Sequence, residues 1–245
     1  MRKLFTVTLG ILCAVSIMGC KARKNYTDSK EATETQTIIE SQKSAETKEA
    51  KETMESVNLL GAWTINSKFE PSENINAMVA FDKATESFEG YKYTVIAVLG
   101  SQIVAGTNYS YLCRAEMVVP DAKPEYVIVN VYEDLDGNAE ITGSLSLLEG
   151  KEGWEYNDIN PFMEENKEVK AAFDKALDGL TGAEYKPIAY IGYKDNSYAV
   201  LTKITITSVE PLISLSTVYI TKTDSGAMID DIYDIDMSLE NVGNQ

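Results

Sequence analysis

The chain has 245 residues, 44% of them hydrophobic, and its 38 acidic and 22 basic residues give a formal net charge of −16. Such a length and apolar content suffice for one large domain or two small ones, each with its own core. The negative charge repels phosphate backbones, so we expect no nucleic-acid partner. The sequence contains no histidine, which excludes Ser-His-Asp and Cys-His catalytic arrangements and His-based zinc sites. We therefore expect no bound metal or cofactor and no enzyme, the alternative being an enzyme that uses carboxylates alone.

Residues 1–19 have the layout of a signal peptide, with a basic start followed by an apolar stretch that is short for a membrane span. The run Ile17-Met18-Gly19-Cys20 resembles the lipobox of bacterial lipoproteins, although Met18 stands where alanine or serine is usual. This resemblance implies cleavage before Cys20, acylation of that cysteine, and anchoring at the extracytoplasmic face of the bacterial cell membrane. A plain secretory signal with an incidental cysteine is the alternative.

Residues 20–57 are rich in Lys, Glu, Thr, Ser and Ala, and Tyr26 is their single aromatic residue. The segment has no sustained apolar stripe, so it cannot bury enough surface to offset the entropy lost on ordering. We expect a lipidated flexible tether that holds the folded part of the protein away from the membrane.

The rest of the chain contains two copies of one pattern. The run Ala-Phe-Asp-Lys-Ala occurs at 80–84 and again at 172–176, and a tryptophan precedes the phenylalanine of each copy by 18 or 19 positions. The stretches 93–100 and 185–192 also correspond, at the same distance after the two copies. Two copies with a period near 90 residues indicate tandem domains rather than a solenoid. We expect one domain at 58–149 and a second at 150–245.

Each copy predicts the same elements: a short strand around the tryptophan, a helix that carries the repeated run, and several strands joined by turns. Spacings of three and four indicate an apolar stripe on each helix. The stripe residues are Ile75, Met78, Val79 and Phe81 in the first copy and Val169, Ala172, Phe173, Ala176 and Leu177 in the second. A helix followed by antiparallel strands predicts an α+β fold in which the helix packs on the sheet.

A projecting hairpin is expected in the first copy, where an apolar strand at 93–99 enters a turn of small residues and the alternating strand 109–119 leaves it. The turn Gln102-Ile103-Val104-Ala105-Gly106 resembles the Gln-x-Val-x-Gly hairpin of the cystatins, protein inhibitors of papain-like cysteine proteases. The resemblance implies two tandem cystatin-like units, the second degenerate, each running strand, helix and four strands. It further implies that the chain occludes the active-site cleft of such a protease without chemistry.

In the cystatin family three segments form the inhibitory wedge. Leu60 and Gly61 correspond to the N-terminal arm, where a glycine lets the chain lie against a cleft without Cβ obstruction. In the hairpin we expect an apolar tip at Val104, a positive φ at Gly106, and amide groups of Gln102 offered to the target.

The third segment, a second hairpin with Pro-Trp in the family, departs from the pattern. Residues 134–139 hold its place, with Leu135 and Gly137 as the residues that stand in for the missing pair. An aromatic anchor at an interface contributes strongly to affinity, so the departure predicts weaker inhibition or another target. The same residues begin a calcium-loop pattern but lack its distal glutamate, and Asp-Gly chemistry favours a hairpin.

The second copy lacks the motif, and its loop at 192–198 is about three residues shorter. Only the first copy can therefore inherit the inhibitory function. Cys113, the one cysteine of the body of the protein, lies on a predicted strand and is expected to be a buried small hydrophobe. The alternative function is a non-inhibitory envelope lipoprotein that acts as a scaffold or recognises a protein or a glycan, since a fold alone does not carry an activity.

Overall fold

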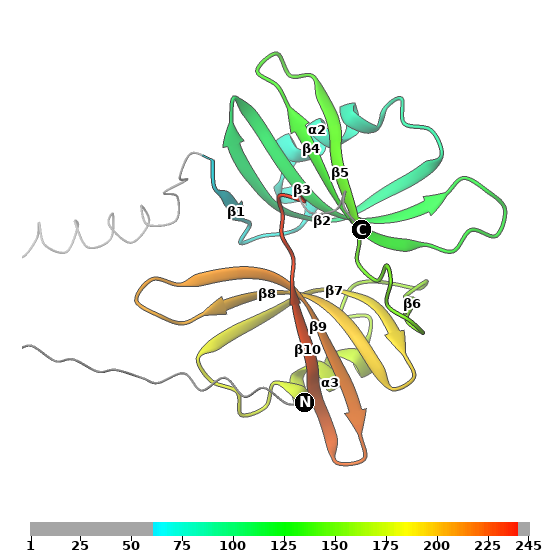
Figure 1. Ribbon diagram of the computed structural model, residues 1–245, viewed down its shortest axis with the longest axis vertical. Helices are drawn as coiled ribbons and strands as arrows, with labels where there is room; N and C mark the ends of the chain where they lie inside the picture. Colours follow the sequence, from blue (N-terminus) through cyan, green and yellow to red (C-terminus); the bar gives the residue numbers. More distant parts are fainter. Residues whose placement is uncertain (1–60, 240–245) are drawn as a thin grey trace, which may run out of the picture. The chain divides into compact units, whose positions relative to one another are not determined.

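The computed structural model describes residues 61–239 (Figure 1). The expected signal peptide, Cys20, the tether and Leu60 lie outside the described residues. The described residues belong to one compact unit. None of the helices in this part of the chain is long and apolar enough to cross a membrane.

The first repeat forms one helix and one five-stranded sheet. All neighbouring strands are antiparallel, and their order across the sheet is β1-β2-β3-β4-β5. The elements are β1 (Trp63–Ile65), the 3-10 turn η2 (Pro71–Glu73), α2 (Ile75–Thr85), β2 (Tyr91–Val104), β3 (Gly106–Met117), β4 (Glu125–Glu133) and β5 (Ala139–Ser146).

The second repeat has the same arrangement, with an antiparallel sheet in the order β10-β9-β8-β7-β6. Its elements are β6 (Glu155–Tyr156), α3 (Lys167–Ala176), β7 (Ala183–Lys194), β8 (Ser197–Ile206), β9 (Leu212–Thr223) and β10 (Gly226–Asp234). Two antiparallel sheets with one α-helix each confirm the predicted α+β class. The boundary expected at 149/150 falls in the turn between β5 and β6.

The duplication extends to single hydrogen bonds. After the first strand of each repeat an asparagine ties the chain to the neighbouring long strand: Asn66 Nδ2 donates to the Val98 carbonyl at 3.0 Å, and Asn157 Nδ2 donates to the Tyr190 carbonyl at 3.2 Å. The register of β2 against β3 shifts twice, and that of β7 against β8 shifts at the corresponding positions. Such irregularities bend a strand, so both sheets curve at the same places.

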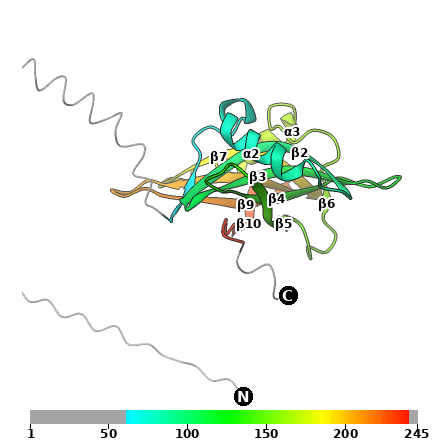
Figure 2. The same ribbon diagram turned by 90° about the horizontal axis from the view of Figure 1, so that it is seen from above.

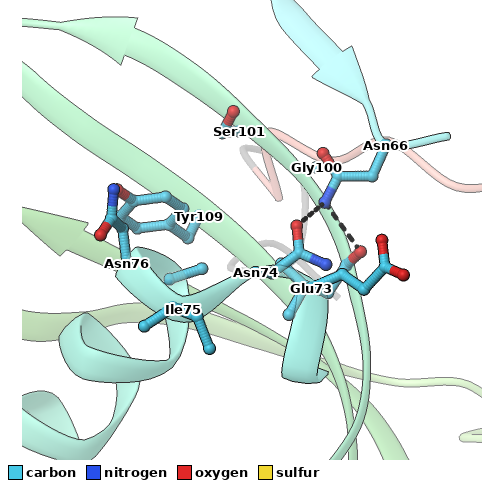
Figure 3. Close-up of a pocket in the computed structure, with 10 residues that line it drawn as sticks. Asn66, Glu73, Asn74, Ile75, Asn76, Gly100, Ser101 and Tyr109 are labelled. Carbon is cyan, nitrogen blue, oxygen red and sulfur yellow. Dashed lines mark hydrogen bonds between the residues drawn. The ribbon is translucent and has the colours of Figure 1, made fainter. Parts of the chain in front are cut away.

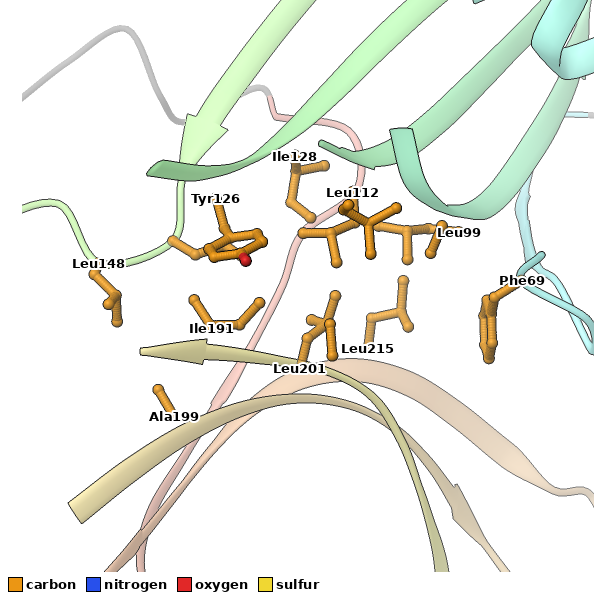
Figure 4. Close-up of a cluster of buried hydrophobic side chains, with 14 of the residues drawn as sticks. Phe69, Leu99, Leu112, Tyr126, Ile128, Leu148, Ile191, Ala199, Leu201 and Leu215 are labelled. Atoms are coloured by element: carbon orange, nitrogen blue, oxygen red, sulfur yellow. The ribbon is translucent and has the colours of Figure 1, made fainter. Parts of the chain in front are cut away.

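Alternate residues of each sheet face two different apolar layers. On the first sheet, Tyr111 and Val129 pack with Phe81 of α2, while Leu112 and Ile128 face the second sheet. The second sheet divides in the same way between α3 and the first sheet. The described residues therefore stack as helix, sheet, sheet and helix, and Figure 4 shows the apolar side chains that meet between the two sheets. Figure 2 looks down on the stack from the top of Figure 1, and in this view α2 and α3 are both drawn towards the upper edge of the picture.

The two repeats contact each other in a pseudo-symmetric way. Lys203 Nζ donates to the Asn66 carbonyl at 3.1 Å, and Arg114 of the first repeat lies 3.4 Å from the Asp158 carbonyl of the second. The segment that leaves each sheet also crosses to the other repeat, as the tail after β10 does in Figure 1, where Asn130 Nδ2 donates to the Met237 carbonyl at 2.6 Å. Reciprocal contacts of this kind are typical of a two-fold interface between like units.

Two details of the helix prediction need correction, and one strand prediction holds. Ile75 and Val79 are 61% and 46% exposed, so they do not belong to the buried stripe of α2. The buried stripe of α2 runs through Ala77, Ala80 and Phe81 instead, so the buried face is rotated about the helix axis from the predicted one. Cys113 is buried, as expected, and burial raises the pKa of its thiol well above the ordinary value.

Two glycines let the edge strands β1 and β6 lie close to β2 and β7, and replacing these glycines tests that packing. A Cβ on Gly100 would lie 2.4 Å from the Thr64 carbonyl oxygen, and one on Gly192 would lie 2.3 Å from that of Glu155. We expect Gly100→Ala and Gly192→Ala each to lower the free energy of unfolding by about 2 kcal/mol or more, because backbone must move. Gly143→Ala, whose Cβ would meet only Leu239 at 3.4 Å, is the control, and urea unfolding is the measurement. Equal stability of all three variants would contradict this packing.

A second stability test uses two buried tyrosines. The Tyr126 hydroxyl has no hydrogen-bond partner within the described residues, whereas the Tyr111 hydroxyl donates to the Ala77 carbonyl at 2.6 Å. Tyr126→Phe should therefore stabilise the protein by about 1 kcal/mol, and Tyr111→Phe should destabilise it by a similar amount.

Tyr126→Phe should also change how the stability of the protein depends on alkaline pH. Burial raises the pKa of Tyr126 to about 12, whereas in the unfolded chain the hydroxyl ionises near the ordinary tyrosine pKa of about 10. Ionisation of Tyr126 therefore leaves the stability of the protein unchanged below that pH and lowers it as pH rises towards 12. Tyr126→Phe should lose less stability than wild type over this range in urea unfolding. An identical pH dependence of the two proteins would count against the buried, unpartnered hydroxyl.

Candidate functional site

The three segments singled out in the sequence emerge at one end of the first sheet. β1 pairs with β2 so that Trp63 lies opposite Gln102, which places Gly61 beside the β2–β3 hairpin. β3 pairs with β4 so that Thr107 lies opposite Glu133, which brings the β4–β5 hairpin to the other side of the same turn. We call this end, formed by Gly61, the hairpin 102–106 and residues 134–138, the candidate edge.

The arm is fixed to the hairpin by two hydrogen bonds. The Gly61 amide donates to the Ile103 carbonyl at 3.0 Å, and the Gly61 carbonyl accepts from Gln102 Nε2 at 2.9 Å. Gly61 has a φ of +85°, in the region that favours glycine, and a Cβ there would meet nothing within 4 Å. The described chain thus enters the first strand at the candidate edge.

The β2–β3 turn is tight, since Ala105 alone separates the two strands. Gly106 has a φ of +126°, and a Cβ on it would lie 2.4 Å from the Glu133 carbonyl oxygen. The positive φ predicted for this glycine is therefore confirmed, and close approach of β4 makes glycine necessary. The Tyr132 hydroxyl donates to the Ala105 carbonyl at 2.5 Å, so a residue that sequence reasoning missed also fixes the turn.

The side chains of this hairpin divide into internal and outward groups. Gln102 is turned inward: besides its bond to the arm, its Oε1 accepts from Asn108 Nδ2 at 2.7 Å. The expectation that its amide serves a target is therefore replaced by a positioning role for the arm. Ile103 and Val104 are each 39% exposed, and Ala105 is exposed. The outward surface of the turn is consequently apolar.

The β4–β5 hairpin is held by an aspartate rather than by an aromatic pair. Asp134 Oδ2 accepts from Asn138 Nδ2 at 2.9 Å and Asp134 Oδ1 accepts from the Asn138 amide at 2.8 Å. These two bonds hold the pKa of the Asp134 carboxyl below its usual value. Gly137 has a φ of +80°, and its carbonyl accepts from Lys83 Nζ of α2 at 2.7 Å. Leu135 is left 84% exposed at the tip. The calcium-like sequence is thus used to close a turn.

The second repeat presents a different end. Its β7–β8 turn is three residues shorter, because Gly192 pairs with Ala199 where Gly100 pairs with Ser110. Asp195 takes the left-handed position there, with a φ of +51°. Gly153 before β6 has a φ of +78°, close to that of Gly61. Gly153 directly precedes Trp154, whereas Gly61 lies two residues before Trp63, so the two glycines are one position apart when the repeats are aligned. The longer hairpin belongs to the first repeat alone.

A polar cavity of about 410 Å³ lies beside the candidate edge, between the start of α2 and strands β2 and β3 (Figure 3). Asn66, Asn74, Asn76, Ser101 and Tyr109 are among the residues that line it. The paired amides of the first two fix its wall, with Asn66 Nδ2 donating to Asn74 Oδ1 at 3.0 Å. Asn66 and Asn74 have counterparts in the second repeat, Asn157 and Asn166. A comparison of the two copies in the sequence could have revealed this signal.

The corresponding place in the second repeat is occupied. Tyr190 stands where Val98 lines the cavity, and its ring packs edge-on against Tyr198 at 5.9 Å. Glu168 accepts from the Tyr198 hydroxyl at 3.2 Å and pairs with Lys222 at 2.5 Å. The lysine is the main cause that holds the pKa of the Glu168 carboxyl below its usual value. The cavity is therefore a feature of the first repeat.

Among residues 61–239 no group of three or more Cys, Asp and Glu side chains is placed to hold a metal ion. The described candidate edge offers outward apolar side chains and backbone groups, which suit recognition of another surface.

No model of a known protein family matches the sequence. A search of curated proteins also finds no match. Among solved structures, a chain described as an Ntf2 like protein involved in plasmid conjugation is similar over 69% of this chain and 90% of its own length. The two are 11% identical and their TM-score is 0.23.

The positioning role of Gln102 can be tested without any partner. Gln102→Glu keeps the acceptors for Asn108 but removes the donor to the Gly61 carbonyl. We expect the Gly61 amide to exchange with solvent about fivefold faster, in line with about 1 kcal/mol for a net hydrogen bond. Lys194→Met, which removes the bond to the Glu152 carbonyl in the second repeat, is the control. An unchanged exchange rate at Gly61 would refute the role.

Proposed function

We propose that this protein is a reversible inhibitor of papain-like cysteine proteases that acts by occluding their active-site cleft, and that its repeats are cystatin-like units. The observation that carries the proposal is the meeting of Gly61, the hairpin 102–106 and the hairpin 134–138 at one end of a single sheet. These segments were selected from the sequence by their resemblance to the cystatin wedge. The antiparallel order β1-β2-β3-β4-β5 brings them to one end of the sheet, and the proposal adds that this end faces a protease cleft.

The order of elements supports the same proposal. Each repeat runs strand, helix and four antiparallel strands, with the strands adjacent in chain order. This is the arrangement that the cystatin resemblance implies. The fold would present the first repeat's hairpins outward and leave the second repeat without an inhibitory loop.

The surface chemistry of the candidate edge suits insertion into a groove. Ile103, Val104 and Leu135 are exposed apolar side chains at the tips of two turns, and none of them belongs to the apolar layer between the sheets. Exposed apolar groups at a projecting edge gain most when a partner covers them. Because both turns are already fixed by internal hydrogen bonds, binding would cost little additional ordering.

The missing aromatic pair sets the expected strength. Leu135 offers less contact area than a tryptophan, and aromatic anchors commonly dominate binding energy at interfaces. The inhibition proposed here is accordingly weak or moderate, and it rests mainly on the first hairpin and the arm.

We also propose that the protein acts at the bacterial cell surface, held through lipid on Cys20 at the extracytoplasmic face of the membrane. The basis is the sequence Ile17-Met18-Gly19-Cys20 together with the polar residues 20–57 that follow it. Two or three acyl chains would anchor the protein firmly, whereas one would bind only marginally.

A non-inhibitory binding lipoprotein is the second candidate. The observation that favours it is the polar cavity beside the candidate edge, whose asparagine amides and Tyr109 ring suit a polyhydroxylated ligand such as a glycan. Under this proposal the longer hairpin serves to shape the cavity wall at Ser101 and Tyr109. Glycan binding by a chain that inhibits no protease would favour it.

The decisive test measures inhibition by the full chain. Wild type should compete with substrate for at least one papain-like protease, and Val104→Asp should weaken that inhibition at least tenfold, because it places a charge on an apolar contact that binding would bury. Initial rates with varied substrate and inhibitor give the inhibition constants.

The matched control is Val118→Asp. Val118 is 70% exposed and follows β3 at the end opposite the candidate edge, so its substitution should leave inhibition unchanged. Failure of folded wild type to inhibit any protease of a panel at high micromolar concentration would reject the inhibitor proposal. Equal effects of the two substitutions would reject the location of the site.

A further inference from the structure

A second cavity lies where the two repeats meet, and none of its lining residues belongs to the candidate edge. It has a volume of about 590 Å³. Its wall is built by the end of β5 and the turn after it, by β9 and β10, and by the tail that follows β10. Apolar side chains form much of the wall, among them Leu145, Leu147, Ile235 and Leu239.

Two tyrosines form a corner of this cavity. The rings of Tyr219 and Tyr233 are nearly perpendicular, at 87°, with centroids 5.6 Å apart. Tyr219 is 5% exposed and is held by the edge-on ring of Trp154 at 4.9 Å, whereas Tyr233 is 48% exposed. The corner thus has a fixed inner wall and an outer wall that is open to solvent.

The corner already holds an ammonium group. Lys151 Nζ lies 3.4 Å from the centroid of the Tyr233 ring and 5.2 Å from that of Tyr219. Glu149, Asp234 and Asp236 also line the cavity, yet within the described residues Lys151 is placed over the rings rather than in an ion pair. The negative faces of the two rings and the nearby carboxylates together make this a site suited to a cation.

The cavity is larger than the lysine requires, and the lysine side chain is held there only by its contacts with the two rings. Lys151 lies in the loop between the repeats, outside any strand, and its side chain makes no hydrogen bond within the described residues. The apolar wall would cover an alkyl body, while the carboxylates lower the potential at the mouth. Nothing in the candidate edge depends on this arrangement.

From this geometry we propose that the cavity between the repeats binds an alkylammonium ligand, whose cationic head takes the place of the Lys151 ammonium against Tyr219 and Tyr233. Lys151 acts as a tethered competitor that keeps the corner filled when ligand is absent. Removing its charge should therefore tighten binding, because a tethered group competes at a high effective concentration.

The test uses the full chain and n-pentylammonium as the probe, with binding followed by calorimetry or by NMR shifts. Lys151→Met keeps the length of the side chain without its charge, and it should bind the probe at least tenfold more tightly than wild type. Lys151→Arg retains a cation and should bind no more tightly than wild type. Adding Tyr233→Leu to Lys151→Met should abolish the gain, whereas adding Tyr193→Leu, which alters a tyrosine outside this cavity, should preserve it.

Charge specificity is measured with n-pentanol and pentanoate, which share the alkyl body. Preference of Lys151→Met for n-pentylammonium over both supports the site. If Lys151→Met binds n-pentanol as tightly as n-pentylammonium, the cavity recognises only the alkyl body and the proposal is overturned. Equal affinity of wild type and Lys151→Met for n-pentylammonium would also overturn it. If Lys151→Met fails to fold, Lys151→Gln replaces it with the same expected results.

Discussion

The apolar layer between the two sheets is the constraint on which the rest of the structure depends. Each sheet has one face against its own helix and a second apolar face, so neither repeat could leave the other without exposing a core. Strand β2 reflects this double burial, because the consecutive residues 96–99 are all buried. The edge strands approach the glycines of β2 and β7 closely, and the segments after β5 and β10 cross to the opposite repeat, which closes the ends of the layer.

This layer assigns a role to the second repeat that does not require a binding loop. By covering the second face of the first sheet, it holds the strands whose ends carry the candidate edge. The hairpins themselves remain outside the layer, since their tip residues extend beyond the paired core of the sheet. A short turn at 195–196 is then sufficient in the second repeat, because that turn has only to reverse the chain.

Sequence alone predicted the elements well and their assembly poorly. Repeated letters revealed the duplication, and turn residues located the hairpins, because both signals are local. Periodicity could not tell what covers the second face of a strand, so the layer between the repeats was not foreseen. Ile75 and Val79 were misplaced because alanines, with little hydrophobic signal, line the buried side of α2. The inward turn of Gln102 depends on Gly61, 41 positions away, and no local pattern reports such a contact.

The two repeats serve as controls for each other, and this comparison separates architecture from function. Asn66 and Asn157, which follow the first strands, each donate to a carbonyl of the neighbouring long strand, so this hydrogen bond does not argue for binding by itself. Among the described residues, the longer hairpin at 102–106 and its support from Tyr132 occur only in the first repeat. The bond from Gln102 to the Gly61 carbonyl has a counterpart in the second repeat, where Lys194 Nζ donates to the Glu152 carbonyl at 2.9 Å. Three extra residues at a tight turn cost entropy, and internal hydrogen bonds hold them with apolar side chains outward. A repeat that merely needed to reverse its chain had the shorter solution available, so the longer hairpin is the feature on which the proposal of a protease partner rests.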